Sequence, residues 1–145
     1  MIMVCANRAS LRLARRREVP IRVARLRFAS DVMPEANFDG ELLVYDPPRT
    51  LEMRWGTDIL RFELRPDGAG TVLAFSDTIT EVGKGARDTA GWHVCIDRLE
   101  SALDGTSPDG NPHWKLLNEM YVERFGPEAS TIGPPQEWQD AYGDS

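Results

Sequence analysis

The sequence predicts an α+β domain in which an antiparallel sheet is covered by an amphipathic helix. Apolar and polar residues alternate in four consecutive segments between residues 38 and 78. Turn-forming residues separate these segments, and apolar residues then recur at three-and-four spacing over residues 88–104. A chain of 145 residues is long enough to bury a core of this kind without disulfides or metals.

The four alternating segments predict a meander of strands joined as hairpins. Two prolines follow Asp46, Gly56 follows the second segment, and a Pro-Asp-Gly turn follows the third. An upstream segment, residues 21–28, also alternates and predicts a further strand. The expected meander strands are residues 38–46, 50–56, 58–66 and 71–78.

Alternation also assigns the two faces of this sheet. In the second segment Met53 and Trp55 point one way, and in the fourth Leu73 and Phe75 are the inward pair. Arginines occupy the opposite parity, so we expect them to face solvent: Arg54, Arg61 and Arg65.

Two helices are expected after the strands. The apolar stripe over residues 88–104 predicts the covering helix, preceded by a loop at residues 84–86 and followed by Gly105. Residues 112–125 predict a second helix, with Asn111 as the N-cap and Pro112 in its first turn. The first stripe consists of Trp92, Cys95, Ile96, Leu99, Ala102 and Leu103.

The N-terminal segment differs in composition from the rest of the chain. Residues 1–30 hold eight arginines and one acidic residue, a charge of +7, whereas the remaining residues carry −13. Pro20 and the scarcity of serine argue against a transit peptide, and no aromatic residue interleaves these arginines as a nucleic-acid arm would require. Two interpretations of residues 1–30 stay open: a solvated strand or helix, or an altered start of the chain.

Composition excludes several classes of protein. A net charge of −6 disfavours nucleic-acid binding, and no apolar run approaches the roughly 18 residues of a membrane-spanning helix. Cys5 and Cys95 are far apart and belong to no CxxC pair, so neither a disulfide framework nor a zinc site is indicated. We therefore expect a soluble, cytoplasmic protein without cofactors, either a monomer or a homodimer.

Several motifs resemble a known superfamily. The stretches LLVYDPPRTLEMRW, FELRPDGAGTVLAFSDT and AGWHVCIDRLESAL occur in an order and spacing similar to those of the START-like (SRPBCC) superfamily. The branch they resemble is that of homologues of the activator of the heat-shock protein 90 ATPase. The resemblance covers roughly residues 21–105 and implies a curved antiparallel sheet gripping a long C-terminal helix, with a cavity between them.

The resemblance also predicts how the chain divides into segments. Residues 21–126 form the START-like domain with its C-terminal helical extension, and residues 127–145 form an irregular acidic tail. Members of the superfamily begin with an edge strand and two short helices, which residues 1–20 do not resemble. The chain either replaces that segment or has an altered, truncated start, which would leave a sheet edge exposed and favour self-association.

The sequence offers few residues for catalysis or metal binding. His93 and Cys95 are two positions apart on one helix, so their side chains diverge and cannot act as a base and nucleophile pair. We expect Cys95 to be a packed core thiol and His93 a flanking or surface residue. The acidic residues Asp77, Glu81 and Asp88 lack metal-loop spacing and are expected to be solvated loop charges.

The expected function is therefore non-catalytic binding of a small hydrophobic ligand in the cavity that the resemblance implies. Two alternatives stay open: a protein that docks on a chaperone, and a cyclase- or hydrolase-like enzyme that uses the same pocket. The candidate pocket-lining residues are the large apolar side chains of the sheet and helix: Met53, Trp55, Leu60, Phe62, Leu73, Phe75, Trp92, Ile96 and Leu99.

Overall fold

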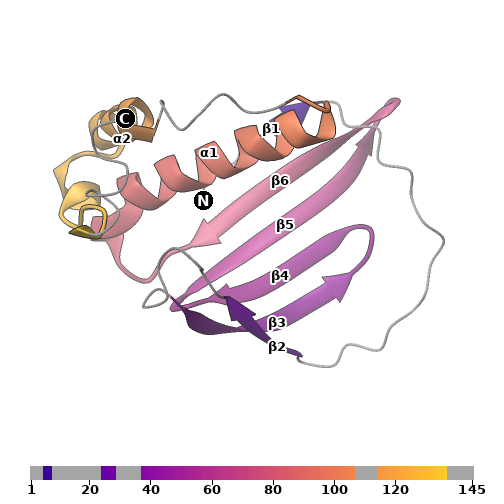
Figure 1. Ribbon diagram of the computed structural model, residues 1–145, viewed down its shortest axis with the longest axis horizontal. Helices are drawn as coiled ribbons and strands as arrows, with labels where there is room; N and C mark the ends of the chain where they lie inside the picture. The colour runs from indigo at the N-terminus through magenta and orange to yellow at the C-terminus, as the bar shows by residue number, and fades with distance from the viewer. Residues whose placement is uncertain (1–4, 8–23, 29–36, 107–113, 137–145) are drawn as a thin grey trace. The chain divides into compact units, whose positions relative to one another are not determined.

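The structure, a computed structural model, describes residues 5–7, 24–28, 37–106 and 114–136. The chain divides into two compact units, residues 1–80 and residues 81–145. The first unit holds the strands and the second holds the helices (Figure 1). Each unit is described below by itself.

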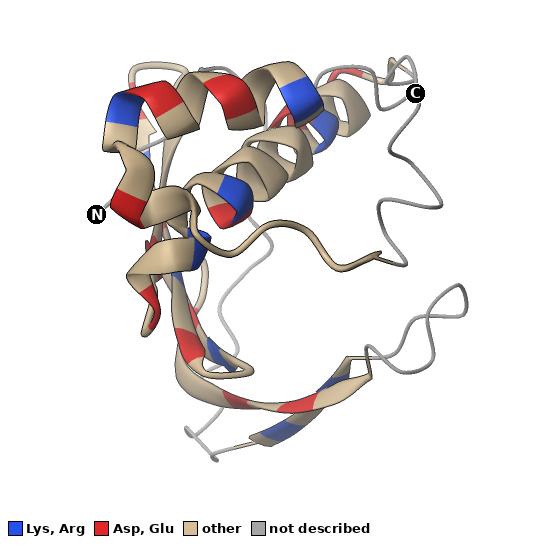
Figure 2. Ribbon diagram, turned by 90° about the vertical axis from the view of Figure 1, so that its left-hand side faces the viewer, with Lys and Arg blue, Asp and Glu red and all other residues tan. Residues whose placement is uncertain are grey.

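The first unit is an antiparallel sheet with the strand order β1-β6-β5-β4-β3-β2. Every neighbouring pair is antiparallel, and the sheet is curved (Figure 2). The meander predicted from alternation is therefore confirmed. The described strands are β1 (Cys5–Asn7), β2 (Ala24–Phe28), β3 (Phe38–Asp46), β4 (Thr50–Trp55), β5 (Asp58–Asp67) and β6 (Gly70–Thr78).

Tight turns fix the register of the two central hairpins. Trp55 pairs with Asp58 across the β4–β5 loop, and the loop begins with Gly56 at a φ of 59°. Asp67 pairs with Gly70 across the β5–β6 loop, which begins with Gly68 at a φ of 57°. A positive φ is strained for residues with a side chain but is open to glycine, so these two glycines allow two-residue loops.

The face of the sheet that carries Arg54 and Arg61 has a network of ion pairs. Arg61 donates to Glu52 at 2.7 Å and to Glu63 at 2.8 Å, and Arg54 lies 3.5 Å from Glu41. The hydrogen bond from Arg61 lowers the pKa of Glu63. Figure 2 shows both blue and red segments on the strands of the sheet. The expectation that Arg54 and Arg61 occupy the polar face is confirmed.

In the second unit the described residues include the α-helices α1 (Gly85–Leu103) and α2 (Trp114–Phe125) and the 3₁₀ helices η2 (Val82–Lys84) and η3 (Pro127–Ser130). The predicted helix over residues 88–104 is confirmed but begins earlier, so the expected loop at residues 84–86 is wrong. Ala86 explains the difference, because it is fully buried with Ala90 and Tyr121 between α1 and α2. That burial outweighs the low helix propensity of Gly85.

The α2 helix matches the second predicted helix over residues 114–125, while Asn111 and Pro112 lie outside the described residues. Within the second unit, the Ile132 amide donates to the Gly83 carbonyl at 3.0 Å, and Arg87 donates to the Gly133 carbonyl at 3.1 Å. These bonds connect the segment after η3 to η2 and to the first turn of α1. The first residues of the expected irregular tail thus form η3, and residues 137–145 lie outside the described part.

The N-terminal segment contributes a strand that the sequence did not indicate. Strand β1 pairs with β6, with Cys5 opposite Ala74 and Asn7 opposite Val72. This edge strand lies within residues 1–20, the segment expected to lack one, while residues 8–23 are outside the described part. Over the described residues, no helix is long and apolar enough to cross a membrane.

Candidate functional site

One face of the sheet is apolar. Residues that lie directly opposite each other on neighbouring strands share a face. Met53 lies opposite Leu60, Phe62 lies opposite Phe75, and Leu64 lies opposite Leu73. All six candidate lining residues of the first unit therefore share this face, as parity predicted: Met53, Trp55, Leu60, Phe62, Leu73 and Phe75. We call it the apolar face.

Burial divides the apolar face into two parts. On β5 and β6, Leu60 and Phe75 are each only 1% exposed and Leu73 is also buried. On β4, Met53 and Trp55 are half-buried. The face continues on β2 and β3 with four further half-buried residues: Leu26, Phe28, Phe38 and Leu42. Phe62 is half-buried too and marks the boundary. Apolar side chains thus remain accessible along β2–β4, whereas Leu60, Leu73 and Phe75 on β5 and β6 belong to the core.

Three aromatic rings pack together at the end of the accessible part. Phe28, Phe38 and Trp55 have ring centroids 4.2–4.9 Å apart. The ring of Phe28 lies over Gly40, where an added Cβ would come within 2.6 Å of the ring and 2.5 Å of the Arg54 carbonyl oxygen. Gly40 therefore lets this ring lie flat on the sheet. The sequence analysis did not single out this aromatic cluster, although Phe28 and Phe38 each begin or end a predicted strand.

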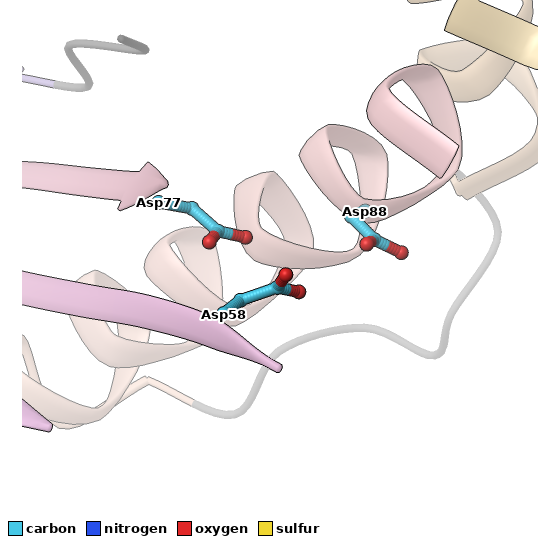
Figure 3. Close-up of side chains that lie close together, drawn as sticks. All are labelled: Asp58, Asp77 and Asp88. Carbon is cyan, nitrogen blue, oxygen red and sulfur yellow. The ribbon is translucent and has the colours of Figure 1, made fainter. Parts of the chain in front are cut away.

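Two carboxylates interrupt the apolar face at the adjoining ends of β5 and β6. Asp58 is two residues before Leu60, and Asp77 lies directly opposite Leu60, so both side chains share the apolar face. Figure 3 shows them extending from the neighbouring strands, and their oxygens lie within 4.8 Å of one another. Asp58 is 5% exposed and Asp77 is 7% exposed.

A set of threonine donors surrounds one oxygen of Asp58. The Thr80 backbone amide donates to Asp58 Oδ1 at 3.1 Å, and the Thr80 and Thr57 hydroxyls each approach the same oxygen at 3.4 Å. Burying a charged group is unfavourable unless it is hydrogen-bonded, and these donors offset that penalty. Asp58 thereby ties the chain that follows β6 to the start of β5.

The buried position of Asp77 corrects an expectation. Asp77 belongs to β6, and Asp88 belongs to α1, where Arg87 Nε donates to it at 2.6 Å. Neither is a solvated loop charge. The carboxylates of Asp58 and Asp77 offer at most about four oxygens, whereas a calcium site has roughly six to eight oxygen ligands. The expected absence of catalysis stays a prediction, because paired carboxylates on an apolar face are groups that acid–base chemistry can use.

The three candidate residues of the second unit lie along α1 and differ in exposure. Trp92 is half-buried, Ile96 is buried, and Leu99 is 43% exposed. Leu103, one turn further on, is 45% exposed. The apolar stripe is therefore buried at one end of α1 and open to solvent at the other. Ligand contact by these residues stays a prediction.

A histidine of α1 is bonded to a tyrosine of α2. His93 Nδ1 lies 2.9 Å from the Tyr121 hydroxyl, and Asp97 lies 3.7 Å from His93 Nε2. Burial raises the pKa of the Tyr121 hydroxyl. His93 is thus half-buried, as expected of a flanking residue, and takes part in the α1–α2 contact.

Cys95 was expected to be a core thiol, and that expectation is wrong, since it lies exposed on α1. The atoms packed around its sulfur still desolvate the thiolate and raise the pKa of Cys95. A raised pKa lowers the fraction of reactive thiolate at neutral pH. Cys95 therefore lacks the activation that a nucleophilic cysteine needs.

Structural comparison finds proteins of similar fold. EF2215, a conserved protein of unknown function from Enterococcus faecalis, superimposes with a TM-score of 0.54 at 23% identity over 68% of this chain. The match covers 58% of EF2215, so this chain matches less than two thirds of that protein's length. CalU16 from Micromonospora echinospora gives a TM-score of 0.49 at 20% identity, over 64% of this chain and 59% of CalU16. A search of curated proteins finds no match.

A family model agrees with the fold and with the motifs. The model described as Activator of Hsp90 ATPase homolog 1-like protein matches residues 24–104, more than half of the chain. The matched segment begins at β2 and ends directly after α1, so α2 and η3 lie outside it. The antiparallel sheet followed by a long helix is the α+β fold of START-like proteins. The chain thus belongs to the family of Activator of Hsp90 ATPase homolog 1-like proteins.

Proposed function

We propose that this protein binds a small hydrophobic ligand on the accessible, β2–β4 part of the apolar face, without chemical conversion. The observation that carries the proposal is the incomplete burial of that face. Met53 and Trp55 are half-buried although they share the face with the fully buried Leu60. Contiguous apolar surface that stays accessible is typical of ligand- and partner-binding sites.

The energetics of such binding follow from the area that the ligand covers. Each Å² of apolar surface removed from water contributes about 25 cal/mol. The aromatic rings of Phe28, Phe38 and Trp55 are large, and their mutual packing holds them in place before the ligand arrives. A preorganised surface loses little side-chain entropy on binding. Leu60, Leu73 and Phe75 lie beside this surface on the same face, where their burial makes them a rigid border to it.

The test is native mass spectrometry of the protein purified from its own host. We expect a small apolar molecule to co-purify with it. Met53→Gln places an amide on the apolar face and should weaken ligand binding about tenfold, because an amide buried without a hydrogen-bond partner is unfavourable. Arg54→Gln introduces the same side chain one residue later on the opposite face and should leave binding unchanged. An empty wild-type protein, or equal losses in both variants, would contradict the proposal.

A second candidate function is docking on a chaperone of the Hsp90 type, and two observations favour it. The family is named for an activator of the Hsp90 ATPase. Exposed apolar side chains also lie on the helices of the second unit, namely Leu99, Leu103, Leu116 and Met120. Stimulation of the host chaperone's ATPase by the purified protein, abolished by Leu116→Glu, would support docking. If the purified protein holds no ligand and stimulates the ATPase, docking on the chaperone replaces ligand binding as the proposed function.

We further propose a cytoplasmic location and a monomeric or homodimeric state. The location is supported by two cysteines that are distant in sequence and show no CxxC pairing. The assembly mass comes from the same native spectra, so both the bound ligand and the oligomeric state are read in one experiment.

A further inference from the structure

We draw no further inference here: the strongest candidate, the pair of buried carboxylates Asp58 and Asp77 at the adjoining ends of β5 and β6, is an acidic cluster for which the described residues give no second, independent sign of a bound ion or ligand.

Discussion

The β5–β6 part and the β2–β4 part of the apolar face have the same alternating pattern but different environments. Leu60 and Phe75 are almost fully buried, whereas Met53 and Trp55 on the next strand keep solvent contact. Hydrophobic periodicity therefore identifies which face of a strand is apolar but not whether that face is core. The difference separates residues that stabilise the fold from residues that remain available to a ligand.

The second unit shows the same contrast along one helix. Near its start, α1 buries Ala86 and Ala90 against Tyr121 of α2. Near its end, Leu99 and Leu103 of the same helix are exposed. An apolar residue at helical spacing is thus core in one half of α1 and surface in the other.

The largest effect is expected from a pair of phenylalanines that face each other across β5 and β6. Phe75→Ala should lower the free energy of unfolding by about 3–5 kcal/mol, because Phe75 is almost completely buried. Phe62→Ala, directly opposite and half-buried, should cost about half as much. Urea unfolding of both variants measures the difference. Equal losses would show that Phe62 is as deeply buried as Phe75 in solution.

A smaller effect is expected at Gly40. Gly40→Ala should cost about 1–3 kcal/mol, because the new methyl group meets the Phe28 ring and the Arg54 carbonyl oxygen. The matched control is Gly91→Ala within α1, where a Cβ meets nothing within 4 Å. That substitution should stabilise the protein by about 0.5–1 kcal/mol. Thermal unfolding of the two variants should therefore shift in opposite directions, and a tolerated alanine at Gly40 would contradict the packing described for the aromatic cluster.

Removing the buried carboxylate of Asp58 should lower the free energy of unfolding by about as much as Gly40→Ala, or slightly less. Asp58→Ala leaves the Thr80 amide without its carboxylate acceptor and should cost about 1–3 kcal/mol. Asp46→Ala, which removes an exposed partner of Arg49, should change stability little. Chemical denaturation compares the two. If both substitutions are neutral, the Asp58 network does not stabilise the end of the sheet.

The smallest effect concerns the α1–α2 contact and alkaline pH. The pKa of Tyr121 is raised in the folded protein, so the folded state holds the phenolic proton more tightly than the unfolded chain. The resulting stability is present below the ordinary tyrosine pKa of about 10 and is lost as the pH rises above it. Tyr121→Phe should make the free energy of unfolding fall less steeply with alkaline pH. Unfolding of both proteins measured between pH 9 and pH 11 tests this prediction, and the same pH dependence in both would contradict a raised pKa for Tyr121.

Local patterns predicted most of the fold. The strands of the meander and both helices follow from alternation, turn residues and helical spacing. The start of α1 was missed because Gly85 and Ala86 resemble a loop until the packing of Ala86 is known. Strand β1 was missed because its three residues are defined by pairing with β6, more than sixty positions away, and not by a local signal.

The site was only partly predictable. Parity placed all six candidate residues of the sheet on one face, as their cross-strand partners show. Parity would also have placed Asp77, two residues after Phe75, on that face, but a carboxylate near a predicted loop favoured a solvated position. Burial depends on packing between distant segments, so Cys95 and Leu99, both in the apolar stripe, are exposed instead of buried.

The most direct test of the central claim is an NMR titration with the apolar probe 8-anilinonaphthalene-1-sulfonate. The Met53 methyl and the Trp55 indole resonances are followed, with assignment by substitution of each residue. We predict saturable shifts of both resonances while the buried methyl groups of Leu60 and Leu73 change little. Shifts confined to the helices of the second unit, or a probe that binds without moving Met53 and Trp55, would contradict ligand binding at the β2–β4 part of the apolar face.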